Sequence, residues 1–140
     1  MSCCTLRNRF VNKCLKSQIQ LIATEEQMLG AAKMMRDICQ PKFKIPNADG
    51  LTLGNFPEDK TLKCYVNCLM EMLQVMKKGK LLYESALKQA EMMLPEEMKP
   101  DYRNGFATCK DSVTAFKDNC EASYALLKCL HANTQKFIFP

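Results

Sequence analysis

The segment Cys64-Tyr65-Val66-Asn67-Cys68 places two cysteines four positions apart, which is about one turn of an α-helix. Side chains at this separation lie on the same face of a helix. Both thiols therefore face neighbouring elements from one side. The segment is typical of a helix that is tied through sulfur to two others.

Four more cysteines extend this pair into a framework. They are Cys39, Cys109, Cys120 and Cys129, so that 24, 3, 40, 10 and 8 residues separate the six in turn. In a chain of 140 residues, such a set indicates disulfides in an oxidising compartment, or metal ligands and buried thiols in a reducing one. Disulfides are favoured, because structural zinc sites commonly add histidines and His131 is the only histidine.

Helix geometry removes some of the pairings that six cysteines allow. If Cys120 and Cys129 share one helix, they lie roughly 13 Å apart along its axis and on opposite faces. A disulfide spans a Cα separation of at most about 7 Å. Each of the two must therefore bond to another element, and the remaining pairings stay open at this point. The expected fold is an all-α, disulfide-stapled bundle.

Periodicity and capping signals predict six helical segments and no strands. A capping box of Thr24 and Gln27 begins the first, which runs to about Ile38, before Pro41. The other segments are expected as a short turn at 47–53, then at 57–78 with a stop at Lys77-Lys78-Gly79, at 81–94, at 95–116 carrying Cys109, and at 118–132.

The C-terminal segment 133–140 ends in the apolar run Phe137-Ile138-Phe139-Pro140. A free apolar tail in water is costly, so this tail is expected to fold back onto the body. Ten methionines and no tryptophan are also unusual, because methionine adapts to irregular spaces and to variable apolar guests. The centre of the bundle is therefore either an apolar ligand pocket or simply a core filled by methionine.

Residues 1–23 differ from the rest of the chain. They carry four basic residues and no acidic one, which is +4 of the net charge of +5. A secretory signal needs a basic start, an apolar run and a small residue at the cut, but Lys13 and Lys16 interrupt the run here. The stretch is expected to be an imperfect signal peptide or a mis-joined start, followed by one domain at 24–140. Three further cysteines lie in this leader: Cys3, Cys4 and Cys14.

The body of the chain argues against several function classes. From residue 24 onward, sixteen basic residues are interleaved with fifteen acidic ones, so no basic stripe is offered to nucleic acid. No glycine-rich phosphate loop occurs, and no motif pairs a nucleophile with His131, so an enzyme is not expected. Metals and cofactors are not expected either. No run approaches the length of a membrane span.

The cysteine spacing, the six short helices and the apolar tail resemble the insect odorant-binding proteins, in their general and pheromone-binding, six-cysteine group. The resemblance covers residues from about 24 to 140. Shorter motifs are similar to the alcohol- and pheromone-binding members of that family. These motifs are Pro-Lys-Phe-Lys at 41–44, Cys-Tyr-x-x-Cys at 64–68, Lys-Lys-Gly at 77–79, Pro-Glu-Glu-Met at 95–98 and Phe-Ile-Phe-Pro at 137–140.

The resemblance implies a six-helix bundle around an apolar ligand cavity, with the tail packed back as a lid. It implies the disulfides Cys39–Cys68, Cys64–Cys120 and Cys109–Cys129. It also implies a set of ligand-binding residues: Met35, Val66, Met70, Leu81, Met93, Phe106, Ser123, Leu130, Phe137 and Phe139. Alcohol-binding members have a serine where Met70 stands and a tryptophan where Phe139 stands. A cavity with few donors should prefer long apolar esters, aldehydes or hydrocarbons over short alcohols.

These expectations combine into a secreted, extracellular carrier, in sensillar lymph or another secretion. It would bind a small hydrophobic volatile odorant or pheromone and deliver it through aqueous fluid to an olfactory membrane receptor. One alternative is a non-sensory secreted carrier or scavenger of hydrophobic small molecules. Another is a cytosolic helical protein with reduced cysteines, which rests only on the poor leader. A receptor and a homodimer stay open as partners, and nucleic acid is not expected.

Overall fold

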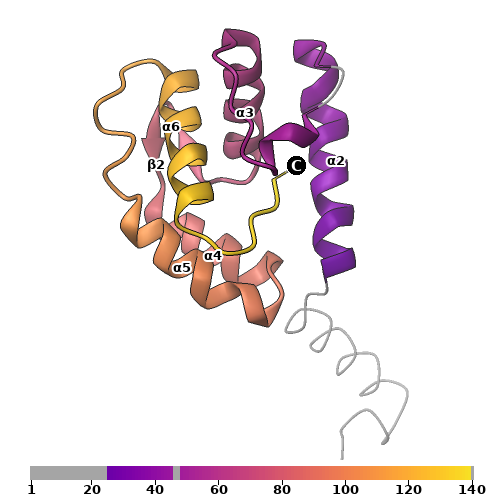
Figure 1. Ribbon diagram of the computed structural model, residues 1–140, viewed down its shortest axis with the longest axis vertical. Coiled ribbons are helices and arrows are strands. Elements are labelled where there is room, and N and C mark those ends of the chain that lie inside the picture. Colours follow the sequence, from indigo (N-terminus) through magenta and orange to yellow (C-terminus); the bar gives the residue numbers. More distant parts are fainter. Residues whose placement is uncertain (1–24, 46–47, 140) are drawn as a thin grey trace, which may run out of the picture.

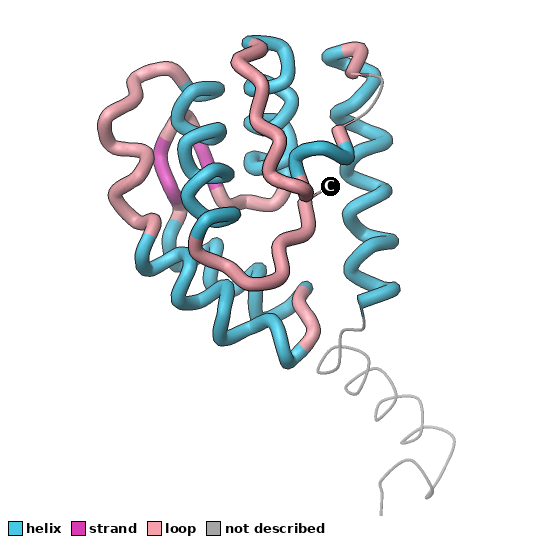
Figure 2. The backbone as a smooth tube through the Cα atoms, in the orientation of Figure 1, coloured by secondary structure: helices cyan, strands magenta, loops and turns pink. Residues whose placement is uncertain are grey.

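The computed structural model describes residues 25–45 and 48–139 of the chain (Figures 1 and 2). In chain order, its helices, 3-10 turns (η) and strands are α2 (Glu25–Phe43), η2 (Asp49–Leu51), α3 (Lys60–Met72), β1 (Met76–Lys77), β2 (Lys80–Leu81), α4 (Tyr83–Met93), η3 (Glu96–Met98), α5 (Lys99–Thr108) and α6 (Asn119–Ala132). The predicted leader at 1–23 and the capping residue Thr24 lie outside the described residues.

The described residues form a disulfide-stapled helical bundle, which confirms the predicted fold class. They contain five α-helices rather than six, because the short segment predicted at 47–53 is only the 3-10 turn η2. None of these helices has both the length and the apolar character that crossing a membrane requires.

Three disulfides fix the relative positions of four helices. Cys64–Cys120 joins α3 to α6 with 4.6 Å between Cα atoms. Cys39–Cys68 joins α2 to α3 at 6.0 Å, and Cys109–Cys129 joins the end of α5 to α6 at 5.8 Å. These are the pairs that the resemblance implies, and the two cysteines of the 64–68 segment do link α3 to two different helices. In Figure 1, α3 and α6 lie side by side, with α4 and α5 below them and α2 at one side.

Helix α2 is longer than predicted and continues through Pro41 to Phe43. Lys44 then adopts a left-handed backbone conformation with φ of 54°, and the N–H of Ile45 donates to the carbonyl of Gln40 at 3.4 Å. This is the hydrogen bond of a Schellman-type C-terminus. The left-handed residue at 44, and not the proline, therefore ends the helix.

Helix α3 is shorter than the predicted segment at both ends. Asp59 caps its start, because its carboxylate accepts a hydrogen bond from the N–H of Thr61 at 2.8 Å. The Lys77-Lys78-Gly79 sequence does not end a helix. Lys78 and Gly79 both have positive φ, of 52° and 78°, as the two central residues of a type I′ turn require. They join β1 to β2, so the prediction that the chain has no strands was wrong for this short hairpin.

Helix α5 ends at Thr108 rather than near residue 116. After it, the carbonyl of Cys109 accepts hydrogen bonds from both the N–H and the hydroxyl of Ser112, at 3.0 and 2.7 Å. Such local side-chain bonds compete with the continuation of a helix. As a result, Cys109 lies just beyond the helix end, where it is fully buried and bonded to Cys129.

Candidate functional site

An apolar cavity of about 110 Å³ lies between the N-terminal half of α2, the end of α3, α4, α5 and the C-terminal tail. Four methionines line it: Met28, Met35, Met70 and Met93. The rest of the wall is made by Ala32, Leu73, Val75, Ala86, Gln89, Ala90, Leu94, Tyr102, Phe106, Leu130, Phe137, Ile138 and Phe139. The wall of the cavity thus consists of flexible thioethers, aliphatic side chains and aromatic rings, with only two polar side chains.

Helical spacing brings the wall residues to one side of each helix. Met28, Ala32 and Met35 follow one another at intervals of four and three residues, so they share one face of α2. Ala86, Ala90 and Met93 repeat the same spacing on α4. The two alanines are buried and small, which leaves room between α4 and the rest of the bundle.

Seven of the ten residues implied by the resemblance lie in this wall. They are Met35, Met70, Met93, Phe106, Leu130, Phe137 and Phe139. Three different elements place the other three residues elsewhere in the structure, and which residues contact a ligand stays a prediction.

Val66, Leu81 and Ser123 do not reach the cavity. Val66 lies one turn before Met70 on α3 and is fully buried in the core. Leu81 belongs to β2, pairs with Met76, and lines a separate surface hollow with Tyr83. The Ser123 hydroxyl donates to the side-chain oxygen of Asn67 at 2.7 Å, which holds it at the contact between α3 and α6.

Several wall residues were missed by the sequence reasoning. Tyr102 lies four residues before Phe106 on α5, and Met28 lies seven before Met35 on α2, so helical spacing could have found both. Ile138 lies between Phe137 and Phe139 in the tail, and no pattern in the sequence indicates that it also lines the cavity.

The C-terminal tail returns from α6 toward α2 and η2, as the yellow segment of Figure 1 shows. The N–H of Gln135 donates to Asp101 at 2.7 Å, and the N–H of Ile138 donates to the Tyr102 hydroxyl at 3.2 Å. Thr52 exchanges hydrogen bonds with the N–H and carbonyl of Phe139, each at 3.3 Å. These bonds hold the tail as one wall of the cavity.

Aromatic contacts connect this tail to the body. The rings of Phe137 and Phe139 are stacked with centroids 6.3 Å apart. The His131 ring stands edge-on to Phe137 at 5.2 Å and to Phe56 at 5.3 Å. Gly54, with φ of +88°, closes over the same ring, and a Cβ there would come within 2.7 Å of the His131 Cε1. Only glycine fits this position without displacing the histidine.

The cavity offers little hydrogen bonding to a ligand. Its two polar side chains are Gln89, whose amide nitrogen donates to Gln74 at 3.4 Å, and Tyr102. Tyr102 is 8% exposed, and burial raises the pKa of its hydroxyl above the ordinary value. Tyr102 therefore stays protonated at neutral pH, as a hydrogen-bond donor.

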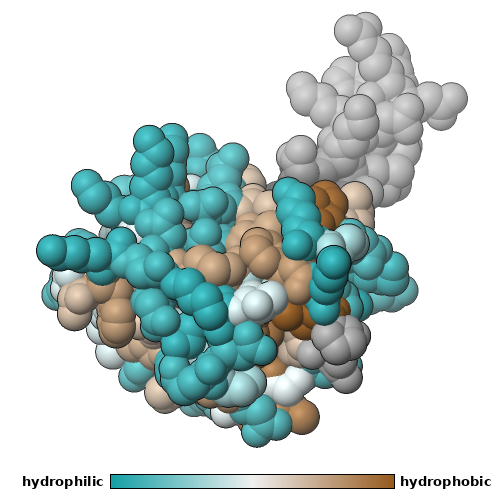
Figure 3. All heavy atoms as spheres, turned by 90° about the horizontal axis from the view of Figure 1, so that it is seen from above, coloured by the Kyte–Doolittle hydropathy of each residue, from teal (hydrophilic) through white to brown (hydrophobic). Residues whose placement is uncertain are grey.

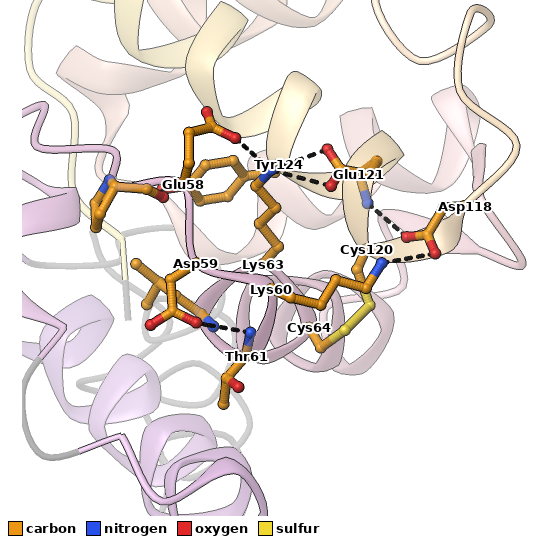
Figure 4. Close-up of polar contacts among 12 residues, drawn as sticks. Glu58, Asp59, Lys60, Thr61, Lys63, Cys64, Asp118, Cys120, Glu121 and Tyr124 are labelled. Carbon is orange, nitrogen blue, oxygen red and sulfur yellow. Dashed lines mark hydrogen bonds and ion pairs between the residues drawn. A yellow bond between two sulfur atoms is a disulfide. The ribbon is translucent and has the colours of Figure 1, made fainter.

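A polar cluster lies at the N-terminal ends of α3 and α6 (Figure 4). The buried Lys63 ammonium contacts Glu58 at 2.5 Å and Glu121 at 3.0 Å, while Lys128 contacts Glu58 at 3.1 Å. Hydrogen bonds from Lys63 and Lys128 lower the pKa of Glu58. The Tyr124 hydroxyl donates to the carbonyl of Pro57 at 2.8 Å. Sequence reasoning missed this cluster.

The cluster has the features of a structural clamp rather than a binding site. It lies beside Cys64–Cys120, and each of its charged groups meets an opposite charge.

Apolar side chains are partly exposed elsewhere on the molecule. Figure 3 shows that hydrophilic side chains cover most of the face seen from above, with hydrophobic surface exposed in the gaps between them.

Comparisons with known proteins place the fold and the cavity in context. The sequence profile of the PBP/GOBP family matches residues 22–133. General odorant-binding protein 19a of Drosophila melanogaster is 47% identical over 122 residues, which cover 84% of each chain. General odorant-binding protein 72 of Anopheles gambiae is 46% identical over 119 residues, which cover 84% of this chain and 98% of that one.

Solved structures agree with the sequence comparison. The crystal structure of odorant binding protein 4 from the predator Chrysopa pallens superposes with a TM-score of 0.76 at 32% identity, covering 85% of this chain and 100% of that one.

Proposed function

We propose a carrier function on the premise that the chain belongs to the PBP/GOBP family of insect odorant-binding proteins. The protein is proposed to be secreted, to bind a small hydrophobic ligand in the cavity, and to carry it through aqueous fluid to a membrane receptor. Its role is binding and release, without catalysis. The observation that carries this proposal is the apolar cavity lined by four methionines and bounded on one side by the tail.

The size of the cavity suggests how a ligand would be accommodated. Its volume of about 110 Å³ is below the ~150 Å³ of an engineered cavity that holds benzene. A ligand with a longer hydrocarbon chain therefore needs more space than this, through the open side of the cavity or by movement of its walls. Methionine side chains have three rotatable bonds and adapt readily to new shapes. We propose that Met28, Met35, Met70 and Met93 rearrange around the ligand.

The tail is the proposed lid of this cavity. The hydrogen bonds described above hold it to Asp101, Tyr102 and Thr52, and no disulfide joins it to the described body. Individual hydrogen bonds of this kind contribute about 0.5–1.5 kcal/mol each. The tail can therefore open without disturbing the disulfide-linked helices, which allows ligand to enter and leave.

The wall chemistry supports a preference among ligands. Met70 is buried at the cavity and brings a thioether where a hydroxyl partner for an alcohol would be needed. A short alcohol brings a hydroxyl proton into a wall with few acceptors, and an unpaired hydroxyl costs about 1–3 kcal/mol in a protein interior. Long esters, aldehydes or hydrocarbons avoid that cost. We propose these as the ligands, bound by the seven cavity-lining residues that the resemblance implies.

A displacement assay tests the carrier function. The secreted protein would be loaded with a fluorescent apolar probe and challenged with compounds that vary in chain length and head group. We expect long esters and aldehydes to displace the probe at lower concentrations than short alcohols. If no compound displaces the probe, or if the probe does not bind, the carrier function is refuted. Locating the transcript in sensory or in glandular tissue then separates odorant delivery from a non-sensory carrier or scavenger.

A further inference from the structure

We propose that Tyr102 determines ligand specificity by donating a hydrogen bond to one carbonyl oxygen of the ligand. The cavity would then select a hydrocarbon chain that carries a single aldehyde, ketone or ester group over the matching alkane. This inference rests on the proposed carrier function and names the ligand class within it.

The position of Tyr102 makes its hydroxyl a donor available in the cavity. A phenol oxygen can accept hydrogen bonds and also donates one proton. The Tyr102 oxygen accepts the N–H of Ile138 at 3.2 Å, and this is its only hydrogen bond among the described residues. Both partners of that bond line the cavity. The hydroxyl proton therefore has no described acceptor, in a wall that is otherwise almost entirely apolar.

A carbonyl group suits this donor better than other head groups. A buried hydroxyl proton without an acceptor is unfavourable, and a ligand oxygen would relieve it. A carbonyl oxygen only accepts, so it brings no proton of its own. An alcohol would bring one, and it would have to find an acceptor in a wall whose only polar side chains are Gln89 and Tyr102. The raised pKa of Tyr102 keeps its hydroxyl protonated, so the donor persists at neutral and mildly alkaline pH.

The same hydroxyl couples the ligand to the tail. When a carbonyl ligand binds, a chain of hydrogen bonds runs from the N–H of Ile138 through the Tyr102 oxygen to the ligand. Hydrogen bonds in such a chain polarise and strengthen one another. An occupied cavity should therefore hold the tail more firmly when the ligand has a carbonyl group than when it is a plain hydrocarbon.

The test compares two ligands in three proteins. A methyl ketone and the n-alkane of equal chain length would each displace the same fluorescent probe from the wild-type protein, from Y102F and from Y124F. Tyr124 is a matched control, because it is also buried and its hydroxyl bonds to Pro57 outside the cavity. Loss of the tail bond in Y102F weakens the binding of both ligands, so the ratio of the two affinities reports the carbonyl contact together with its coupling to the tail.

We expect Y102F to reduce the preference for the ketone over the alkane by about 3- to 10-fold. The Y124F protein should keep the wild-type ratio. An unchanged ratio in a folded Y102F protein would overturn the assignment of Tyr102 while leaving the carrier function intact. Failure of the wild-type protein to bind the probe would instead refute the carrier function itself.

An infrared measurement makes the test independent of the stability of Y102F. A ketone labelled with ¹³C at its carbonyl would be bound to the wild-type protein, and its stretching frequency compared with that in hexane. A hydrogen bond from Tyr102 lowers this frequency, and in a folded Y102F protein the frequency should return toward the hexane value. A wild-type frequency equal to that in hexane would overturn the proposal.

Discussion

The two ends of the α3–α6 pair are held together in different ways. At their N-terminal ends, the disulfide Cys64–Cys120 and the ion pairs of Lys63 form a clamp of strong, directional bonds (Figure 4). At their C-terminal ends, Met70 and Leu130 face a cavity whose other walls are mostly apolar and whose tail is held by hydrogen bonds. Apolar contacts have no preferred direction, so a ligand can replace them.

This contrast explains how a small bundle can tolerate an incompletely filled centre. A cavity removes packing contacts and lowers stability. The disulfides restrict the unfolded chain without contributing any contact to the cavity wall. The clamp therefore supports the fold at one end while the other end stays adaptable. If this division holds, changes at the clamp should alter stability, and changes at the tail should alter ligand binding.

The largest expected effect comes from removing the clamp disulfide. The double variant C64A/C120A opens a link between residues 56 positions apart, which should lower the free energy of unfolding by about 4 kcal/mol in the chain-entropy treatment. The pair C109A/C129A, with a separation of 20, should cost about 3 kcal/mol. Urea unfolding measures both. A folded C64A/C120A protein that has lost its ligand affinity would contradict the idea that the clamp controls stability and not ligand binding.

Deleting residues 137–140 should weaken ligand binding and leave the fold intact. The deletion removes three residues that line the cavity, and burying one aromatic side chain contributes about 1.5–3 kcal/mol. We expect ligand affinity to fall by about tenfold or more and dissociation to become faster, while helical content and the three disulfides are kept. Stopped-flow release of a bound fluorescent probe measures the rate. If the rate of probe release is unchanged, the tail is not a lid. Phe137 and Phe139 would then be interpreted as a surface anchor for a receptor or a second subunit.

Two glycines test the junction between the tail and the body. Gly54 has a positive φ and faces His131, so G54A should destabilise the fold by about 1–3 kcal/mol through backbone strain and displacement of the ring. Gly30 is the control, because it lies in α2 and a Cβ there would meet nothing within 4 Å. G30A should stabilise the protein by about 0.5–1 kcal/mol. Thermal unfolding of the two variants should therefore shift in opposite directions.

The clamp end was more predictable from the sequence than the cavity end. The spacing of Cys64 and Cys68 fixes them on one face of a helix, and that alone shows that α3 is linked to two neighbours. The ion pair between Lys63 and Glu121 was not predictable, since the residues are 58 positions apart and only the folded α3–α6 contact brings them together.

Whether a residue lines the cavity depends on its position along the helix as well as on the helix face that it occupies. Val66 and Met70 share a face of α3, yet only Met70 reaches the cavity. Which turn of a helix meets the cavity is set by the packing of its neighbours, which the hydrophobic period does not encode. The hairpin was missed for a local reason, because Lys78 adopts a positive φ that is uncommon for a residue other than glycine.

The smallest expected effect is a loss of stability in acid that originates at the clamp. Hydrogen bonds from Lys63 and Lys128 hold the pKa of Glu58 below its usual value in the folded protein. The unfolded chain therefore binds a proton at Glu58 more readily. The contribution of this carboxylate is fully present above about pH 4.3 and is lost as the pH falls through the lower, folded-state pKa.

Urea unfolding at neutral pH and near pH 3 should show this difference. Wild-type protein should lose more stability between the two conditions than E58Q, whose amide does not titrate. The effect should be small, because the Glu58 side chain is 69% exposed and solvent screens its ion pairs. E97Q provides the control, since Glu97 is exposed and has no ion pair among the described residues. Equal acid losses in E58Q and wild-type protein would show that the Glu58 carboxylate does not contribute measurably to the strength of the clamp.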